Sequence, residues 1–175
     1  MSKFPESAKF VYHHTGIFVS NLERSIEWYC RVMGYQHVYT RYARLRNLDN
    51  SGTFFEMPLA FLSHNGHYLE LYEMVNAAPF TYENYMNTLG TKHLDLTLPD
   101  DQYDLVRQHF IDEGVSFAVG GPEDGAGPLH SEKTLGKPGG LKVMYIRDPD
   151  GILIEINGEF VPEKYFPGLN QGQQK

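Results

Sequence analysis

The chain has 175 residues, a formal net charge of −7 and an apolar content of 41%. This size suits one domain, or two small similar halves, with a hydrophobic core. The acidic balance and the lack of a basic run argue against a nucleic-acid surface, and no apolar run approaches the ~18–20 residues of a membrane span. The first residues also lack the apolar segment of a secretory signal. We therefore expect a soluble, cytoplasmic protein that acts on a small molecule.

Cys30 is the only cysteine, which excludes an intrachain disulfide and a cysteine-based zinc site. It lies in a helical pattern beside Trp28 and Tyr29. This position favours a buried structural thiol over a catalytic nucleophile.

The first predicted elements are a strand and a helix. Residues 12–19 alternate in polarity and predict a strand with Ile17 and Val19 on one face and His14 on the other. By the same alternation, His13 would point to the helix side. A 3.6-residue period then predicts a helix that ends at a glycine, Gly34. Its expected apolar stripe comprises Leu22, Ile26, Tyr29, Cys30 and Met33.

Three further strands are predicted in the first half. Residues 36–46, rich in tyrosine and arginine, form one strand, and residues 54–63 and 67–73 form two more. Asn65-Gly66 between the last two is the strongest short hairpin signal known. Alternation gives three residues of the final strand a common face: Tyr68, Glu70 and Tyr72.

A second unit begins after a connector over residues 76–90, in which a short helix is expected over 82–89. Residues 92–98 alternate like the first strand, and an apolar 3.6-residue period after Pro99 predicts a helix that ends at Gly114. The order strand, cap, helix and glycine is thus repeated.

The second unit closes with a hairpin. A glycine-rich segment over residues 120–140 precedes two predicted strands, 142–146 and 152–156, which flank the turn sequence Asp-Pro-Asp-Gly at 148–151. Glu155 interrupts the apolar run of the last strand and faces away from its isoleucines. An unpaired buried carboxylate is very costly, so Glu155 must face water, a partner charge or a metal ion.

The pattern is an internal repeat in which each unit reads βαβββ. It predicts an α+β fold, with two βαβββ modules that form a curved, cupped mixed sheet and with helices on the outer face. We expect an N-terminal arm (1–11), a first module (12–75), a connector (76–90), a second module (91–158) and a C-terminal tail (159–175).

The repeat pairs two histidines and two glutamates. His14 corresponds to His93 on the first strand of each unit, and Glu70 corresponds to Glu155 on the last strand. Two imidazoles and two carboxylates on one face make an N₂O₂ site for a divalent ion. Such a set suits Ni, Zn, Co, Fe or Mn rather than calcium, which prefers oxygen ligands alone.

Two motifs carry a family resemblance. Residues 14–29, followed by Met-Gly-Tyr at 33–35, resemble the opening of the vicinal oxygen chelate superfamily, and the Asp-Pro-Asp-Gly turn with Glu155 is similar to its closing motif. This superfamily includes glyoxalase I, methylmalonyl-CoA epimerase, fosfomycin-resistance transferases, extradiol dioxygenases and bleomycin-resistance proteins. The resemblance covers roughly residues 12–158 and implies their common fold.

The ligand pattern is nearest to that of bacterial glyoxalase I, which has His, Glu, His and Glu at the places of His14, Glu70, His93 and Glu155. The epimerase has glutamine at the place of Glu70. The resemblance therefore implies a metal-dependent lyase or isomerase that acts through an enediolate, with Glu155 or Glu70 as the proton-transferring carboxylate.

Two other functions stay open. A non-haem Fe(II) extradiol-type dioxygenase would need only His14, His93 and Glu155. A ligand-sequestering resistance protein of the same fold would bind no metal. The resemblance also implies a homodimer, and the site would form either within one chain or between two chains.

Several residues are candidates for substrate binding. Asp95 shares the face of His93 and would orient an imidazole or carry a proton. His130 in the glycine-rich segment would close over the substrate. Arg41, with Arg44 and Arg46 nearby, is a candidate clamp for a carboxylate such as that of glutathione. Tyr68 and Tyr72, with Tyr39 and Tyr42, are residues of a kind that more often packs than takes part in chemistry. If these four tyrosines line the site, they favour an aromatic or otherwise apolar substrate.

Overall fold

The computed structural model describes residues 11–47, 51–74, 91, 93–122, 129–130 and 142–159. The chain divides into two compact units, Met1–Ala77 and Ala78–Lys175, and each is described by itself. The helix expected over 82–89, and nearly all of the predicted arm, connector and tail, lie outside the described residues.

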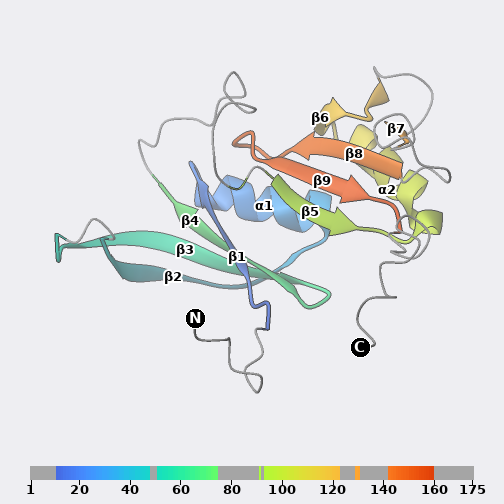
Figure 1. Ribbon diagram of the computed structural model, residues 1–175. Helices are drawn as coiled ribbons and strands as arrows, with labels where there is room; N and C mark the ends of the chain where they lie inside the picture. Colours follow the sequence, from blue (N-terminus) through green and yellow to red (C-terminus); the bar gives the residue numbers. More distant parts are fainter. Residues whose placement is uncertain are drawn as a thin grey trace, which may run out of the picture. The chain divides into compact units, whose positions relative to one another are not determined.

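The first module is a four-stranded mixed sheet with one helix (Figure 1). Its elements in chain order are β1 (Thr15–Val19), α1 (Leu22–Met33), β2 (Gln36–Arg46), β3 (Phe54–His64) and β4 (His67–Glu73). The strands lie in the order β1-β4-β3-β2, with β1 parallel to β4 and the other neighbours antiparallel. This arrangement is the predicted βαβββ module.

Local sequence signals fix the ends of α1 and the β3–β4 turn. The Asn21 side chain caps α1 by accepting a hydrogen bond from the Arg24 amide at 2.8 Å, and Gly34 ends the helix with a φ of 70°. In the hairpin turn, Asn65 and Gly66 have φ values of 46° and 82°. Positive φ at both positions is what a two-residue type I′ turn requires.

The buried stripe of α1 differs from the expected one. Leu22 and Tyr29 are buried as expected, but Ile26, Cys30 and Met33 are only half-buried. Ser25 and Val32 are buried in their place. The stripe is rotated because Ser25 is small enough to let the helix approach the sheet, which a hydrophobicity pattern does not register.

The sheet of the first module has two faces, which we call the helix face and the site face. Ile17, Leu69 and Leu71 are buried on the helix face. Glu73 lies on this face too, and its carboxylate accepts a hydrogen bond from the Leu22 amide at 2.7 Å, at the N-terminus of α1. Because side chains alternate along a strand, the residues between these positions belong to the site face.

The second module repeats this plan (Figure 1). Its elements are β5 (His93–Thr97), α2 (Asp100–Asp112), β6 (Ser116–Val119), β7 (Leu129–His130), β8 (Lys142–Arg147) and β9 (Leu153–Asn157). The strand order is β5-β9-β8-β6, with β5 parallel to β9, and the short β7 also pairs with β8. Its helix face carries Leu94, Ile154 and Ile156, and its site face carries the alternate residues.

Strand β6 is an element that the sequence patterns did not predict. Its four residues are too few for a periodic signal, and it is held by antiparallel pairing with β8, from Ser116 with Arg147 to Val119 with Tyr145. The two-residue strand β7 was not predicted either; it lies in the glycine-rich segment over residues 120–140 and pairs with β8. The other differences are small shifts of strand ends; β1, for example, begins at Thr15 rather than at residue 12. The predicted α+β fold with two βαβββ modules is confirmed.

Neither helix of the described residues has the length and apolarity that a membrane crossing requires.

Candidate metal centre

The first histidine–glutamate pair lies at the start of β1. The parallel pairing of β1 with β4 sets Gly16 beside Glu70, and His14 immediately precedes β1. His14 Nε2 is 3.1 Å from Glu70 Oε2. The Glu70 residue is buried, with 8% of its surface exposed, whereas the His14 side chain is 36% exposed. The first module therefore brings two of the four predicted ligands together.

Tyr72 restrains the Glu70 carboxylate. Its hydroxyl donates a hydrogen bond to Oε2, the same oxygen that faces His14. Burial, followed by the hydrogen bond and the negative charge of Glu70, raises the pKa of Tyr72 to about 12. The hydroxyl is thus a donor at any physiological pH. Gly16 leaves room for this ring, because a Cβ atom there would lie 3.2 Å from Tyr72 Cε2.

The second pair lies at the equivalent place in the second module. His93 is the first residue of β5, and its Nε2 is 3.0 Å from Oε2 of Glu155 on β9. The Tyr145 ring on β8 packs edge-on against the His93 ring, with 5.9 Å between their centroids. The side chains of His93 and Glu155 are 34% and 16% exposed.

Asp95 is the neighbour of Glu155 in the parallel pairing of β5 with β9. Asn157 Nδ2 donates a hydrogen bond to Asp95 Oδ1 at 2.7 Å. Burial raises the pKa of Asp95, the Asn157 hydrogen bond opposes the rise, and the charge of Glu155 adds to it. Asp95 is therefore held beside Glu155, where sequence alternation placed it.

Within each pair, the distance between the two donor atoms is one that two ligands of the same metal ion can have. Two donor atoms about 2.1 Å from an ion and about 90° apart around it are about 3.0 Å from each other. Within the described ranges, no group of three or more His, Cys, Asp or Glu side chains that could hold a metal ion occurs. The structure thus gives two separate His–Glu pairs, one in each module, and the convergence of all four side chains stays a prediction.

Comparison with known families identifies the fold's relatives. The model of the glyoxalase/bleomycin resistance protein/dioxygenase superfamily matches residues 11–156. The chain belongs to this superfamily. Its members include glyoxalases, dioxygenases and fosfomycin resistance proteins, so membership by itself does not choose a reaction. A search of curated proteins finds no significant match.

Solved structures of the superfamily share the fold at low identity. A glyoxalase/dioxygenase from Nostoc punctiforme is 19% identical over 92% of this chain and 99% of its own, with a TM-score of 0.59. A superfamily domain from Frankia sp. EAN1pec is 15% identical over 87% and 94%, also with a TM-score of 0.59. A mutant of the fosfomycin resistance protein FosX from Listeria monocytogenes, complexed with Mn(II) and 1S,2S-dihydroxypropylphosphonic acid, is 13% identical over 89% and 97%, with a TM-score of 0.58.

The expectation that His13 points to the helix side was wrong. Alternation placed His13 on the helix side, but its Nδ1 lies 2.6 Å from Nδ1 of His14, and its ring lies 6.0 Å from the Tyr68 ring and 6.1 Å from the Phe61 ring. The reason is that β1 begins only at Thr15, so the alternation of a strand does not extend back to these two residues.

The candidate substrate residues of the first module divide between the two faces. Tyr68 and Tyr72 share the site face with Glu70, and Arg41 joins them because it pairs with Leu59, which pairs with Tyr72. Alternation along β2 puts the other two candidate arginines, Arg44 and Arg46, on the helix face. They are therefore excluded from a clamp on the site face. His130 lies in β7, opposite Lys142, and its side chain is outside the described part of the structure.

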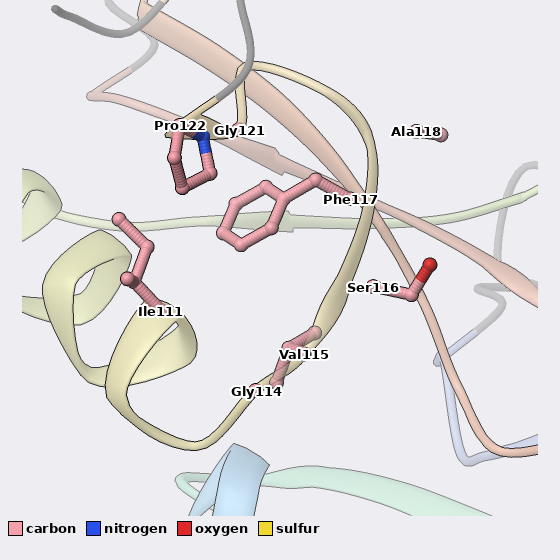
Figure 2. A pocket seen from close by; sticks show the side chains of 8 residues that line it. All are labelled: Ile111, Gly114, Val115, Ser116, Phe117, Ala118, Gly121 and Pro122. Carbon is pink, nitrogen blue, oxygen red and sulfur yellow. The ribbon is translucent and has the colours of Figure 1, made fainter.

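A hollow of about 360 Å³ lies elsewhere in the second module, between the end of α2 and β6. Figure 2 shows Ile111, Phe117 and Pro122 pointing toward one another across it. None of the residues that line it carries a titratable side chain. We assign no chemistry to this hollow, because acid–base and metal chemistry require such groups.

Tyr39 lies on the site face, as expected of a tyrosine that lines the site, whereas alternation along β2 puts Tyr42 on the helix face and makes that expectation wrong.

Sequence patterns missed two features of the site face. Phe61 reaches it through the β3–β4 pairing, and its ring is stacked on that of Tyr39 with 5.5 Å between centroids. The hydrogen bond between Tyr72 and Glu70 was also missed. Their i, i+2 spacing on one strand face was the available signal, since such neighbours lie about 7 Å apart and a tyrosine can span that distance.

Proposed function

We propose that the protein is a metal-dependent lyase or isomerase of the glyoxalase I type that acts on a small oxygenated substrate. The observation that carries this proposal is the equivalence of the two pairs, with His–Glu distances of 3.1 and 3.0 Å at the same place in each module. Two imidazoles and two carboxylates would together hold Ni, Zn, Co, Fe or Mn. The Mn(II) complex of FosX supports a divalent ion in this superfamily.

The residues have distinct roles in the proposed reaction. A divalent ion held by the two pairs supplies Lewis-acid stabilisation of the negative charge that develops on two vicinal substrate oxygens. Glu155 or Glu70 takes the proton from the carbon next to them and returns it elsewhere. Tyr72 fixes the position of Glu70, and Asp95 is held beside Glu155 by Asn157.

We also propose the remaining site residues and the assembly. Tyr68, Tyr72 and Arg41 contact the substrate from the site face, and His130 closes over it. The protein works as a cytoplasmic homodimer, and the two pairs meet either within one chain or between two subunits. The intact ligand set argues against a ligand-sequestering protein that binds no metal.

A second candidate is a non-haem Fe(II) dioxygenase. It is favoured by the Tyr72 hydrogen bond, which satisfies the Glu70 oxygen that would otherwise bind the ion. If Glu70 stood off the metal, two histidines and Glu155 would form the facial triad of such enzymes and leave positions open for O₂ and substrate.

Metal content and two assays on the purified full chain test these proposals. We expect the purified protein to contain about one divalent ion per chain, because each ion is held by two His–Glu pairs, and mass spectrometry measures this content. We also expect metal-dependent turnover of the methylglyoxal–glutathione hemithioacetal or, for another substrate, exchange of a carbon-bound proton with D₂O. Oxygen uptake with catechol after Fe(II) loading would favour the dioxygenase, and absence of any bound metal would contradict both enzymes.

The variant Glu70→Gln separates the two enzymes further. In a four-ligand site it removes a carboxylate ligand and weakens metal binding, whereas in a triad enzyme Fe(II) binding is retained. Glu56→Gln is the matched control, because Glu56 lies exposed on β3 and pairs with Arg44 on the helix face.

A further inference from the structure

The site face of the first module carries a row of aromatic rings that begins at the His–Glu pair. Glu70 on β4 pairs with Phe61 on β3, and Phe61 pairs with Tyr39 on β2, so the three side chains follow one another across three strands. Centroid distances are 5.5 Å from Tyr39 to Phe61 and 5.5 Å from Phe61 to Tyr68. The apolar surface is therefore continuous with the candidate metal ligands.

These rings remain accessible. Tyr39 is 41% exposed, and Phe61 and Tyr68 are half-buried. A contiguous apolar surface that is exposed beside polar catalytic groups is typical of a ligand-binding site, because water leaves it when an apolar ligand binds. The part of a ligand that lies over this row must be apolar, since a polar group there would lose its hydration without a hydrogen-bond partner.

A positive charge marks the far end of the row. The Arg41 guanidinium lies 5.9 Å from the centroid of the Tyr39 ring, and Arg41 is exposed. No carboxylate among the described residues forms an ion pair with it. The ring contact holds the guanidinium on the site face, so an incoming anion need not order it.

The spacing between these groups limits the shape of the ligand. Neighbouring strands are about 4.8 Å apart, so β4 and β2 are separated by about 10 Å. Arg41 is two residues further along β2 than Tyr39, which is in register with Glu70 through Phe61. Two residues along a strand add about 7 Å, so Glu70 and Arg41 are about 12 Å apart, with Phe61 and Leu59 on the strand between them. This separation fits a molecule with one benzene ring in the middle and a polar group at each end.

We propose that the substrate is an aromatic acid, with two vicinal oxygens at the His14–Glu70 pair, its ring over Phe61 and Tyr39, and a second anionic group at Arg41. This assignment rests on the proposed function for the position of the vicinal oxygens. It also gives Arg41 a specific role, since the anion that it binds belongs to the far end of the substrate.

Three probe acids test the proposal with the full chain loaded with Co(II). Lactate has vicinal oxygens only, mandelate adds a phenyl ring, and 4-carboxymandelate adds a carboxylate at the far end. Calorimetry gives each affinity, and the visible absorption bands of Co(II) report whether the oxygens reach the metal. We expect each added group to tighten binding at least tenfold.

Two matched pairs of variants on β2 identify the surface. Arg41→Gln should abolish the preference for 4-carboxymandelate over mandelate, whereas Arg44→Gln on the helix face should preserve it. Tyr39→Ser should reduce the preference for mandelate over lactate, whereas Tyr42→Ser, at a position 78% exposed and also on the helix face, should not.

The outcomes separate this proposal from the proposed function. If Co(II) binds but the three acids bind equally, or if Arg44→Gln acts like Arg41→Gln, the aromatic-acid proposal is wrong and the metal site stands. If Co(II) does not bind, the proposed function is contradicted, and the order of the three affinities still decides whether the aromatic row and Arg41 select the ligand.

Discussion

The Tyr72 hydroxyl donates a hydrogen bond to the carboxylate oxygen of Glu70 that also faces His14. Outer partners of this kind orient a metal ligand, and their loss typically costs about 10- to 100-fold in metal affinity. We expect Tyr72→Phe to weaken binding of a divalent ion by about this factor without changing the fold. Titration against a coloured chelator, with far-ultraviolet circular dichroism for the fold, measures both. Tyr42→Phe is the control, and an equal loss in both variants would show that the Tyr72 hydroxyl has no special role.

Gly16 should matter because of the space that it leaves for Tyr72. A Cβ atom at residue 16 would lie 3.2 Å from the Tyr72 ring, and the extra methyl groups of valine would displace the ring. Gly16→Val should therefore weaken metal binding about as much as Tyr72→Phe does. The double variant should be no weaker than either single variant, because both remove the same hydrogen bond. Additive losses would mean that Gly16 acts by another route.

Glu73 should stabilise the fold through α1. Its carboxylate accepts the Leu22 amide hydrogen at 2.7 Å, at the positive end of the helix dipole. Glu73→Ala should lower the free energy of unfolding by about 1–2 kcal/mol in urea denaturation. Glu27→Ala is the control, since its ion pair with Arg31 is exposed and should contribute less than about 0.5 kcal/mol.

His67 should make stability depend on pH. Burial, and then the charge of His64, lowers the pKa of His67. As the pH falls below about 6.5, the unfolded chain therefore binds a proton that the folded protein does not, and stability decreases. His67→Asn, which keeps a polar atom near the Tyr35 hydroxyl, should lose less stability between about pH 7.5 and pH 5.5 than the wild type. Thermal unfolding across this range measures the difference. Identical pH curves for His67→Asn and the wild type would refute the prediction.

Mixing two inactive variants should show where the site is assembled. One variant carries His14→Ala with Glu70→Ala, and the other carries His93→Ala with Glu155→Ala. If the pairs meet between subunits, refolding an equal mixture should restore about a quarter of the wild-type metal binding, because half of the dimers are mixed and each has one intact site. If the pairs meet within one chain, the mixture should bind no more metal than the separate variants.

The sequence by itself determined the longer elements and the repeat. Alternation and helical periods are local properties of the chain, so α1, the Asn65-Gly66 turn and the strands around Glu70 and Glu155 could be predicted from neighbouring residues. Pairing His14 with Glu70 required more than local patterns: the repeat suggested it, and the motifs at the two ends of the chain agreed with it.

Only the tertiary structure decided which side chains share a face across strands. The β3–β4 register sets Phe61 beside Glu70, and the β2–β3 register sets Tyr39 beside Phe61 and puts Arg41, but not Arg44, on the same face. The start of β1 at Thr15 moves His13 next to His14. Strand β6 is too short for a pattern and exists through its pairing with β8. These features depend on hydrogen bonds between residues far apart in the chain, and a shift of one residue in pairing would turn every side chain of a strand to the other face.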